Sequence, residues 1–175
     1  MKLLIYLGIG ALLCIAAPAA AQTVILVRHA EKMDQSVDPQ LSEAGRARAQ
    51  ALATALSGTR LTHILVTPLQ RTTQTASVTA ESQGLSVEPI SIEGGALHIE
   101  RVVNRIRELP PEAVVLVVGH SNTIPSISRD LGAAAGDMDD CEFDRLTMID
   151  LREDQEPVVI TSRYGAASQT CSTSQ

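Results

Sequence analysis

The chain has 175 residues, with 14 Lys and Arg against 20 Asp and Glu, and its formal net charge at pH 7 is −6. This length suffices for one domain with a substantial core. A net acidic protein is a poor match for nucleic acid or an anionic lipid surface. Aromatic residues make up only 2% of the chain, which also argues against the exposed ring platforms that bind single-stranded nucleic acid.

The first 21 residues have the layout of a secretory signal peptide. Lys2 gives a positive start, an apolar segment runs from Leu3 to about Ala17, and small residues precede position 22. A retained membrane anchor is the alternative, but it would leave almost no linker before the first expected strand. We therefore predict cleavage after Ala21, a secreted or periplasmic location, and one domain over residues 22–175 with no stable membrane anchor.

The cysteines point to one disulfide. Cys14 lies in the leader, so Cys141 and Cys171 remain as an even pair in an oxidising compartment. We predict that these two form a disulfide, with two free thiols as the alternative. Residues 165–175 are rich in Ala, Ser and Thr, and we predict a mobile tail there.

Strands and helices are expected to alternate along the chain. Apolar runs and turn residues predict strands at 24–28, 63–66, 87–92, 114–118, 145–151 and 157–163, and helices at 43–57, 68–82, 96–109 and 123–131. Ser42 is the expected N-cap of the first helix. This order predicts an α/β fold, a three-layer αβα sandwich with a mainly parallel, mixed central sheet and an antiparallel edge.

Charged residues follow two of the buried strands at the point where each strand ends. Arg28 and His29 end the first apolar run, and His120 follows the run at 114–118. Open α/β sheets place their ligand crevices at the carboxyl ends of the strands. Arg71 lies in the first turn of an expected helix and is able to point over the same edge. A capping role for each histidine and a surface role for Arg71 are the alternatives.

Two guanidiniums and two imidazoles together suit a phosphate group. Guanidinium forks match the oxygens of a tetrahedral oxyanion, and a neutral imidazole nitrogen is able to attack phosphorus. This chemistry needs no metal and no cofactor. A zinc site formed by the histidines with Glu31 or an Asp is an alternative that the arginines oppose. The acidic loop at 137–140 is a further candidate metal site, for calcium, but the interpretation as a solvated surface loop is favoured.

Three motifs in this order resemble the histidine phosphatase superfamily, whose fold is phosphoglycerate mutase-like. Arg28-His29-Ala30-Glu31 resembles the Arg-His-Gly-Glu signature. The stretch Thr67-Pro68-Leu69-Gln70-Arg71-Thr72-Thr73-Gln74-Thr75-Ala76 resembles the second motif, and Gly119-His120 the third. The resemblance spans essentially the whole chain after the leader, and it implies the fold expected above.

The resemblance also implies roles for single residues. His29 is the nucleophile that accepts the phosphoryl group, Arg28 and Arg71 clamp the phosphate, and His120 stabilises the group in transfer. Asn122 is a candidate substrate-binding residue.

One departure from the family concerns the proton donor. Members that act on poor leaving groups carry a Glu or Asp general acid after the second motif. Here Glu93 is the candidate acid, with a role as a surface turn residue as the alternative, and His98 and Glu100 are weaker candidates. Long capping insertions are also missing from the sequence.

These features predict a metal-independent phosphatase that hydrolyses phosphomonoesters through a phosphohistidine on His29. Its partner is a phosphorylated small molecule, an envelope component or a phosphoprotein, and no nucleic acid is expected. A non-catalytic phosphate-binding protein of the same fold is the main alternative. A phosphomutase is a further one, although no second phosphate site is visible.

Overall fold

The computed structural model describes residues 21–134, 136–169 and 171. Its strands are β1 (Ala21–Arg28), β2 (His63–Val66), β3 (Val87–Pro89), β4 (Val114–Gly119), β5 (Arg145–Arg152) and β6 (Val158–Arg163), and its helices are α1 (Glu43–Ala55), α2 (Gln70–Gln83), α3 (Ala96–Glu108) and α4 (Thr123–Asp130). The predicted signal peptide, apart from Ala21, lies outside the described residues. Within them, no helix is long and apolar enough to cross a membrane.

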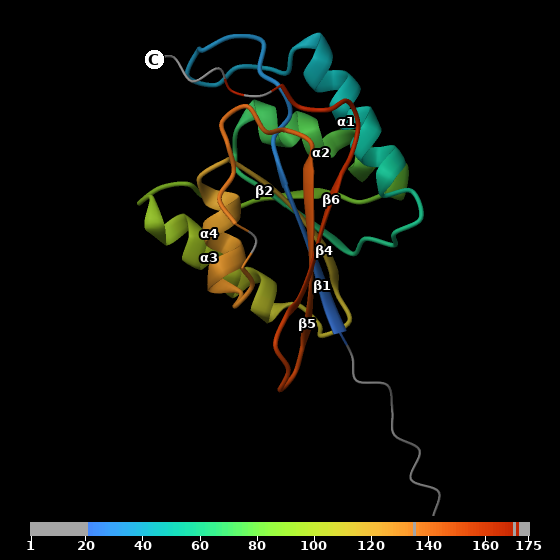
Figure 1. Ribbon diagram of the computed structural model, residues 1–175, viewed down its shortest axis with the longest axis vertical. Coiled ribbons are helices and arrows are strands. Elements are labelled where there is room, and N and C mark those ends of the chain that lie inside the picture. The colour runs from blue at the N-terminus through green and yellow to red at the C-terminus, as the bar shows by residue number, and fades with distance from the viewer. Residues whose placement is uncertain (1–20, 135, 170, 172–175) are drawn as a thin grey trace, which may run out of the picture.

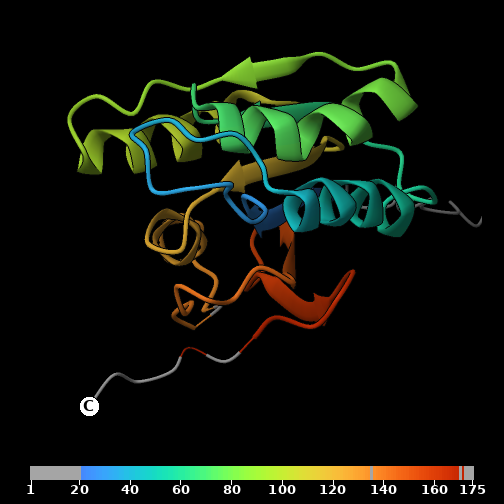
Figure 2. The same cartoon turned by 90° about the horizontal axis from the view of Figure 1, so that it is seen from above.

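The six strands form one mixed sheet in the order β3-β2-β4-β1-β5-β6. The first four in this order run parallel, and β5 and β6 run antiparallel to their neighbours. In Figure 2, β3 (green) and β6 (red) lie at opposite edges of the sheet. The predicted mainly parallel sheet with an antiparallel edge is therefore confirmed.

Helices cover both faces of the sheet. Side chains along a strand alternate between its two faces, so a wholly apolar strand has two apolar faces to bury. On β1, Val24 and Leu26 join a core cluster with residues of α3 and α4, whereas Ile25 and Val27 join a cluster with residues of α1 and α2. Figure 1 shows α1 to one side of the central strands and α3 and α4 to the other. The predicted three-layer αβα sandwich is confirmed.

Two expected elements are shorter than the sequence suggested. The helix expected from Pro68 begins at Gln70, because Leu69 has extended backbone angles of φ −123° and ψ 144°. The Gln70 amide donates to Asp38 Oδ1 at 2.8 Å, so a residue distant in sequence satisfies this helix start. The strand expected at 87–92 ends at Pro89, although the Ile90 amide still donates to the Val66 carbonyl of β2 at 2.8 Å.

The predicted disulfide between Cys141 and Cys171 is confirmed, with the two Cα atoms 5.3 Å apart. It joins the segment before β5 to the C-terminal tail. The described part of that tail has further contacts with the domain: Arg48 Nη1 donates to the carbonyl oxygen of Ala166 at 2.9 Å, and Ser168 Oγ donates to Asp144 Oδ1 at 2.7 Å. Residues 166, 168 and 171 are thus tied to α1 and to the segment before β5.

Candidate active site

His29 and His120 lie side by side at the carboxyl ends of β1 and β4. Arg28 pairs with Gly119 in the parallel ladder, and the His29 amide donates to the Gly119 carbonyl at 2.9 Å. The two imidazole ring centroids are 5.3 Å apart. Parallel pairing of the two strands therefore brings together two histidines that are far apart in sequence.

A cavity of about 980 Å³ opens at this edge of the sheet. Five residues singled out from the sequence line it: Arg28, His29, Arg71, His120 and Asn122. His98, a weaker candidate for the acid, also lines it, as do Lys32, Asp140 and Phe143, which were not assigned a role in the site from the sequence. The positive side chains outnumber the acids, so the cavity favours an anionic ligand.

His29 has the buried, neutral form that a nucleophile requires. Its side chain is 4% exposed, and Nδ1 lies 2.8 Å from the carbonyl oxygen of Ala30. A carbonyl only accepts, so Nδ1 carries the hydrogen and Nε2 keeps its lone pair. Burial, together with the nearby His120, Arg28 and Arg71, lowers the pKa of His29 to about 3, although the hydrogen bond to Ala30 raises it. Burial and Arg71 lower the pKa of His120 to about 4.

These pKa shifts predict a loss of stability in mild acid. A histidine in the unfolded chain has a pKa near 6.5. As the pH falls below that value, His29 is protonated in the unfolded chain but stays neutral in the folded protein, which favours unfolding. The free energy of unfolding should fall between pH 6.5 and pH 4, with His29 contributing on the order of 3 kcal/mol at pH 4. Urea unfolding in phosphate-free buffer measures this, and His29→Asn should be less sensitive to acid than wild type. Equal pH dependence of the two proteins would contradict the assignment.

The guanidinium of Arg28 is held by the loop that precedes β5. Its Nη1 donates to the carbonyl oxygens of Asp139, Asp140 and Glu142 at 3.1, 2.6 and 3.3 Å. Its Cζ lies 4.0 Å from the centroid of the Phe143 ring, within cation–π distance. Since neutral carbonyls fix this group and no carboxylate hydrogen-bonds to it in the described part of the chain, its positive charge stays available to an anion.

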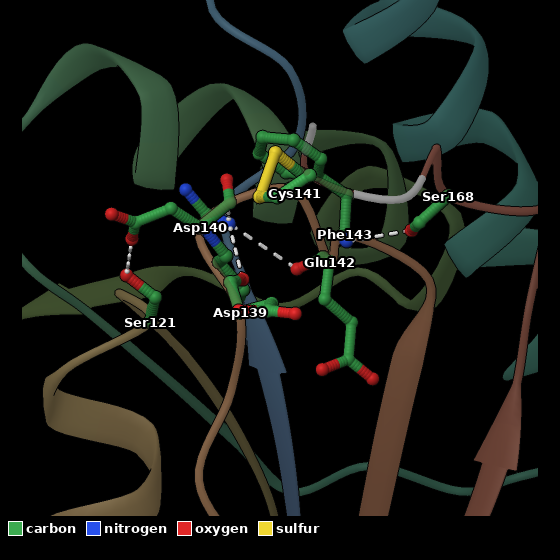
Figure 3. Close-up of a disulfide and its surroundings, with 9 residues drawn as sticks. Ser121, Asp139, Asp140, Cys141, Glu142, Phe143 and Ser168 are labelled. Carbon is green, nitrogen blue, oxygen red and sulfur yellow. Dashed lines mark hydrogen bonds between the residues drawn. A yellow bond between two sulfur atoms is a disulfide. The ribbon is translucent and has the colours of Figure 1, made fainter. Parts of the chain in front are cut away.

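The C-terminal tail supports this loop from behind. Cys141 is linked to Cys171, and Ser168 Oγ accepts from the amides of Phe143 and Asp144 at 2.8 and 3.0 Å. Figure 3 shows the disulfide and Ser168 beside the loop from Asp139 to Phe143. The tail therefore helps to set the position of the carbonyl groups that bind Arg28.

Breaking the disulfide should weaken both the fold and phosphate binding. Replacement of Cys141 and Cys171 by serine removes a cross-link between residues that are 30 positions apart in the sequence. Loss of this cross-link should lower the free energy of unfolding by on the order of 3–4 kcal/mol in the chain-entropy model. Inhibition by inorganic phosphate should weaken several-fold, because the loop no longer holds Arg28 firmly. Chemical unfolding and the inhibition constant measure the two effects. An unchanged inhibition constant in a folded variant would show that the loop keeps Arg28 in place without the disulfide.

Arg71 is the second residue of α2 and lines the cavity, and its positive charge has one distant acidic partner among the described residues. Its Nη1 lies 4.0 Å from Asp38 Oδ1, and its side chain is 16% exposed. Burial lowers its pKa from the ordinary value. Thr75 accepts from the Ala30 amide at 2.9 Å and donates to the Arg71 carbonyl at 2.7 Å. This hydroxyl links the turn after His29 to the helix that carries Arg71.

Thr67 supports His120, a contact that the sequence analysis missed. The Thr67 side chain is buried, and its Oγ1 lies 3.1 Å from His120 Nε2 and 2.8 Å from Thr72 Oγ1. Thr67 does not cap α2, because Leu69 is the N-cap residue of that helix. The position of Thr67 at the start of the second motif was the available signal.

Two acids considered from the sequence lie away from the cavity wall. Glu31 pairs with buried Arg48 at 2.6 Å, so this carboxylate, one of those considered for the zinc alternative, already has an ionic partner. Glu93 is exposed and does not line the cavity, although its neighbour Ile92 does. Among the described residues, Asp140 is the acid that lines it, and no group of three or more His, Cys, Asp or Glu is placed to hold a metal ion.

Comparisons with solved structures agree with this fold. The protein histidine phosphatase SixA, in a complex with tungstate, is 20% identical over 81% of this chain and 96% of its own, with a TM-score of 0.66. A mycobacterial glucosyl-3-phosphoglycerate phosphatase, in a complex with inorganic phosphate, is 19% identical over 83% of this chain and 97% of its own, with a TM-score of 0.58. A search of curated proteins gave no match.

The family model of the histidine phosphatase superfamily (branch 1) matches residues 24–94. This segment contains both His29 and Arg71, whose side chains meet in the cavity described above. The solved phosphatase SixA shares the fold across nearly its full length. Over residues 24–94 the chain is therefore similar to the histidine phosphatase superfamily, and it has the fold of the solved histidine phosphatase with which it was compared.

Proposed function

We propose that this protein is a metal-independent phosphatase that hydrolyses phosphomonoesters through a phosphohistidine on His29. The observation that supports this best is the convergence of His29, His120, Arg28 and Arg71 on one cavity. The proposal also agrees with the solved structures of similar fold, which include a protein histidine phosphatase and a glucosyl-3-phosphoglycerate phosphatase.

The proposed reaction has two steps. In the first, His29 Nε2 attacks phosphorus and displaces the alcohol, while Arg28, Arg71 and His120 stabilise negative charge on the phosphoryl oxygens. In the second, water attacks phosphorus and releases inorganic phosphate and neutral His29. Apolar side chains of Leu69, Ile92 and Ile99 also line the cavity, and they would contact the leaving group.

Hydrolysis of para-nitrophenyl phosphate in the presence of EDTA tests this proposal. Turnover should be unaffected by EDTA, and acid-labile phosphate should be trapped on the protein during turnover. Loss of activity with the chelator would instead support a metal-dependent reaction.

A non-catalytic phosphate-binding protein is the second candidate. It is favoured by the position of Glu93, the acid expected from the resemblance, outside the lining of the cavity. Micromolar binding of phosphate without turnover of any phosphomonoester would support this candidate.

We further propose that the protein acts in the cell envelope or outside the cell. The leader pattern of residues 1–21 supports this location, and a disulfide is typical of oxidising compartments. N-terminal sequencing of the exported protein should find Gln22 as the first residue, and recovery of the uncleaved chain would contradict it.

A further inference from the structure

His98 is a buried histidine of the cavity wall with no role in the reaction described so far. Gly94 and Gly95 have φ angles of 80° and 57°, which favour glycine, and this turn leads directly into α3. His98 is the third residue of the helix, its side chain is 3% exposed, and it lines the same cavity as His29 and His120.

The contacts of His98 fix which ring nitrogen faces the cavity. Its Nδ1 lies 3.0 Å from the carbonyl oxygen of Ser91, and since a carbonyl only accepts, Nδ1 carries the hydrogen. Its Nε2 has no hydrogen bond within the described residues. It is also absent from the set of described side-chain atoms that are both fully buried and without a partner, so this nitrogen is not fully buried. Nε2 is therefore the nitrogen that a ligand in the cavity is able to reach.

The surroundings of His98 link its protonation to a bound anion. Burial lowers the pKa of His98, the Ser91 carbonyl raises it, and the positive charge of Arg101 lowers it. His98 in turn lowers the pKa of His120, so the two rings are electrostatic neighbours. A bound phosphate dianion would offset these positive charges and favour the imidazolium form of His98.

We propose that His98 is the general acid that protonates the leaving group, an assignment that rests on the proposed phosphatase function. In the first step the bond between His29 Nε2 and phosphorus forms, the bond between phosphorus and the ester oxygen breaks, and the proton on His98 Nε2 moves to that oxygen. In the second step neutral His98 takes a proton from the attacking water, and phosphate leaves His29. The imidazolium is thereby restored, and atoms and protons balance over the cycle.

The nearby carboxylates are less suited to this task. Glu93 and Glu100 are exposed and do not line the cavity. Asp140 lines it, but its Oδ1 accepts a hydrogen bond from Ser121 Oγ at 2.6 Å, and its side chain is exposed. His98 combines a fixed tautomer, a buried ring and an accessible nitrogen.

Replacement of His98 by asparagine tests the assignment, because the asparagine amide is able to keep a hydrogen bond to Ser91 but has no transferable proton. We expect kcat/KM for glycerol 2-phosphate, whose alkoxide needs a proton, to fall about 100-fold. For para-nitrophenyl phosphate, whose leaving group departs unprotonated, the loss should stay below about threefold. His98→Gln is the second variant, and thermal unfolding of both identifies any folding defect.

Glu100→Gln, an exposed substitution on the same helix, is the matched control and should leave both values unchanged. An equal loss of kcat/KM for the two esters in folded His98 variants would overturn the assignment, as would an alkyl-selective loss in Glu93→Gln. Wild type that hydrolyses only the aryl ester would also overturn it, with the phosphatase function intact. Wild type that hydrolyses neither ester would overturn the proposed function itself.

Discussion

Replacement of His29 by alanine should lower kcat for para-nitrophenyl phosphate by at least about 10⁴-fold, because it removes the nucleophile itself. His29 Nδ1 is committed to the Ala30 carbonyl at 2.8 Å, which leaves Nε2 free for phosphorus. The remaining cationic groups of the cavity would still bind phosphate. Steady-state kinetics of the variant, together with its inhibition constant for inorganic phosphate, measure both properties.

The control for this substitution is another histidine outside the cavity. His63 begins β2, and its Nδ1 lies 2.9 Å from Thr62 Oγ1, away from the lining of the site. His63→Ala should keep kcat within about twofold, as expected for a surface change. A loss of less than about tenfold in His29→Ala would exclude His29 as the nucleophile.

Replacement of Gly45 by alanine should destabilise the fold by about 3 kcal/mol, at the upper end of overpacking costs. A Cβ atom at this position of α1 would lie 2.2 Å from the carbonyl oxygen of Glu31. That oxygen already accepts from the amide and hydroxyl of Ser42 at 2.9 and 3.2 Å, so it is not free to move away. Urea unfolding measures the loss, and kcat should fall too because Glu31 follows His29 by two residues.

Gly58 provides the matched control for this second substitution. A Cβ atom at Gly58 would have no other atom within 4 Å, apart from its chain neighbours. Gly58→Ala should therefore change the free energy of unfolding by no more than about 0.5 kcal/mol. Similar stabilities of the two variants would show that α1 moves away from Glu31 without cost.

Local sequence was sufficient for much of the fold. The apolar runs at β1 and β4 alternate between the two faces of the sheet, and Ser42 caps α1 by accepting from the Gly45 amide at 3.1 Å. Because parallel strands share a carboxyl edge, the positions of His29 and His120 after these runs were enough to expect them together. The pairing of the two cysteines followed from their number.

Tertiary structure decided the parts of the site that depend on loops. The carbonyl groups of residues 139, 140 and 142 hold Arg28. Because every residue has a backbone carbonyl, the sequence does not indicate which of them will bind an arginine. The same loop brings Phe143 beneath Arg28 and ties it to the tail through Cys141.

The choice between Glu93 and His98 depended on tertiary structure in the same way. Both follow the second motif, but the turn at Gly94 and Gly95 leaves Glu93 exposed and places His98 in the cavity wall. Side-chain periodicity and strand order were thus sufficient to predict that the two histidines lie together. The residues around them depend on the paths of loops, which are fixed by contacts between segments that are distant in the sequence.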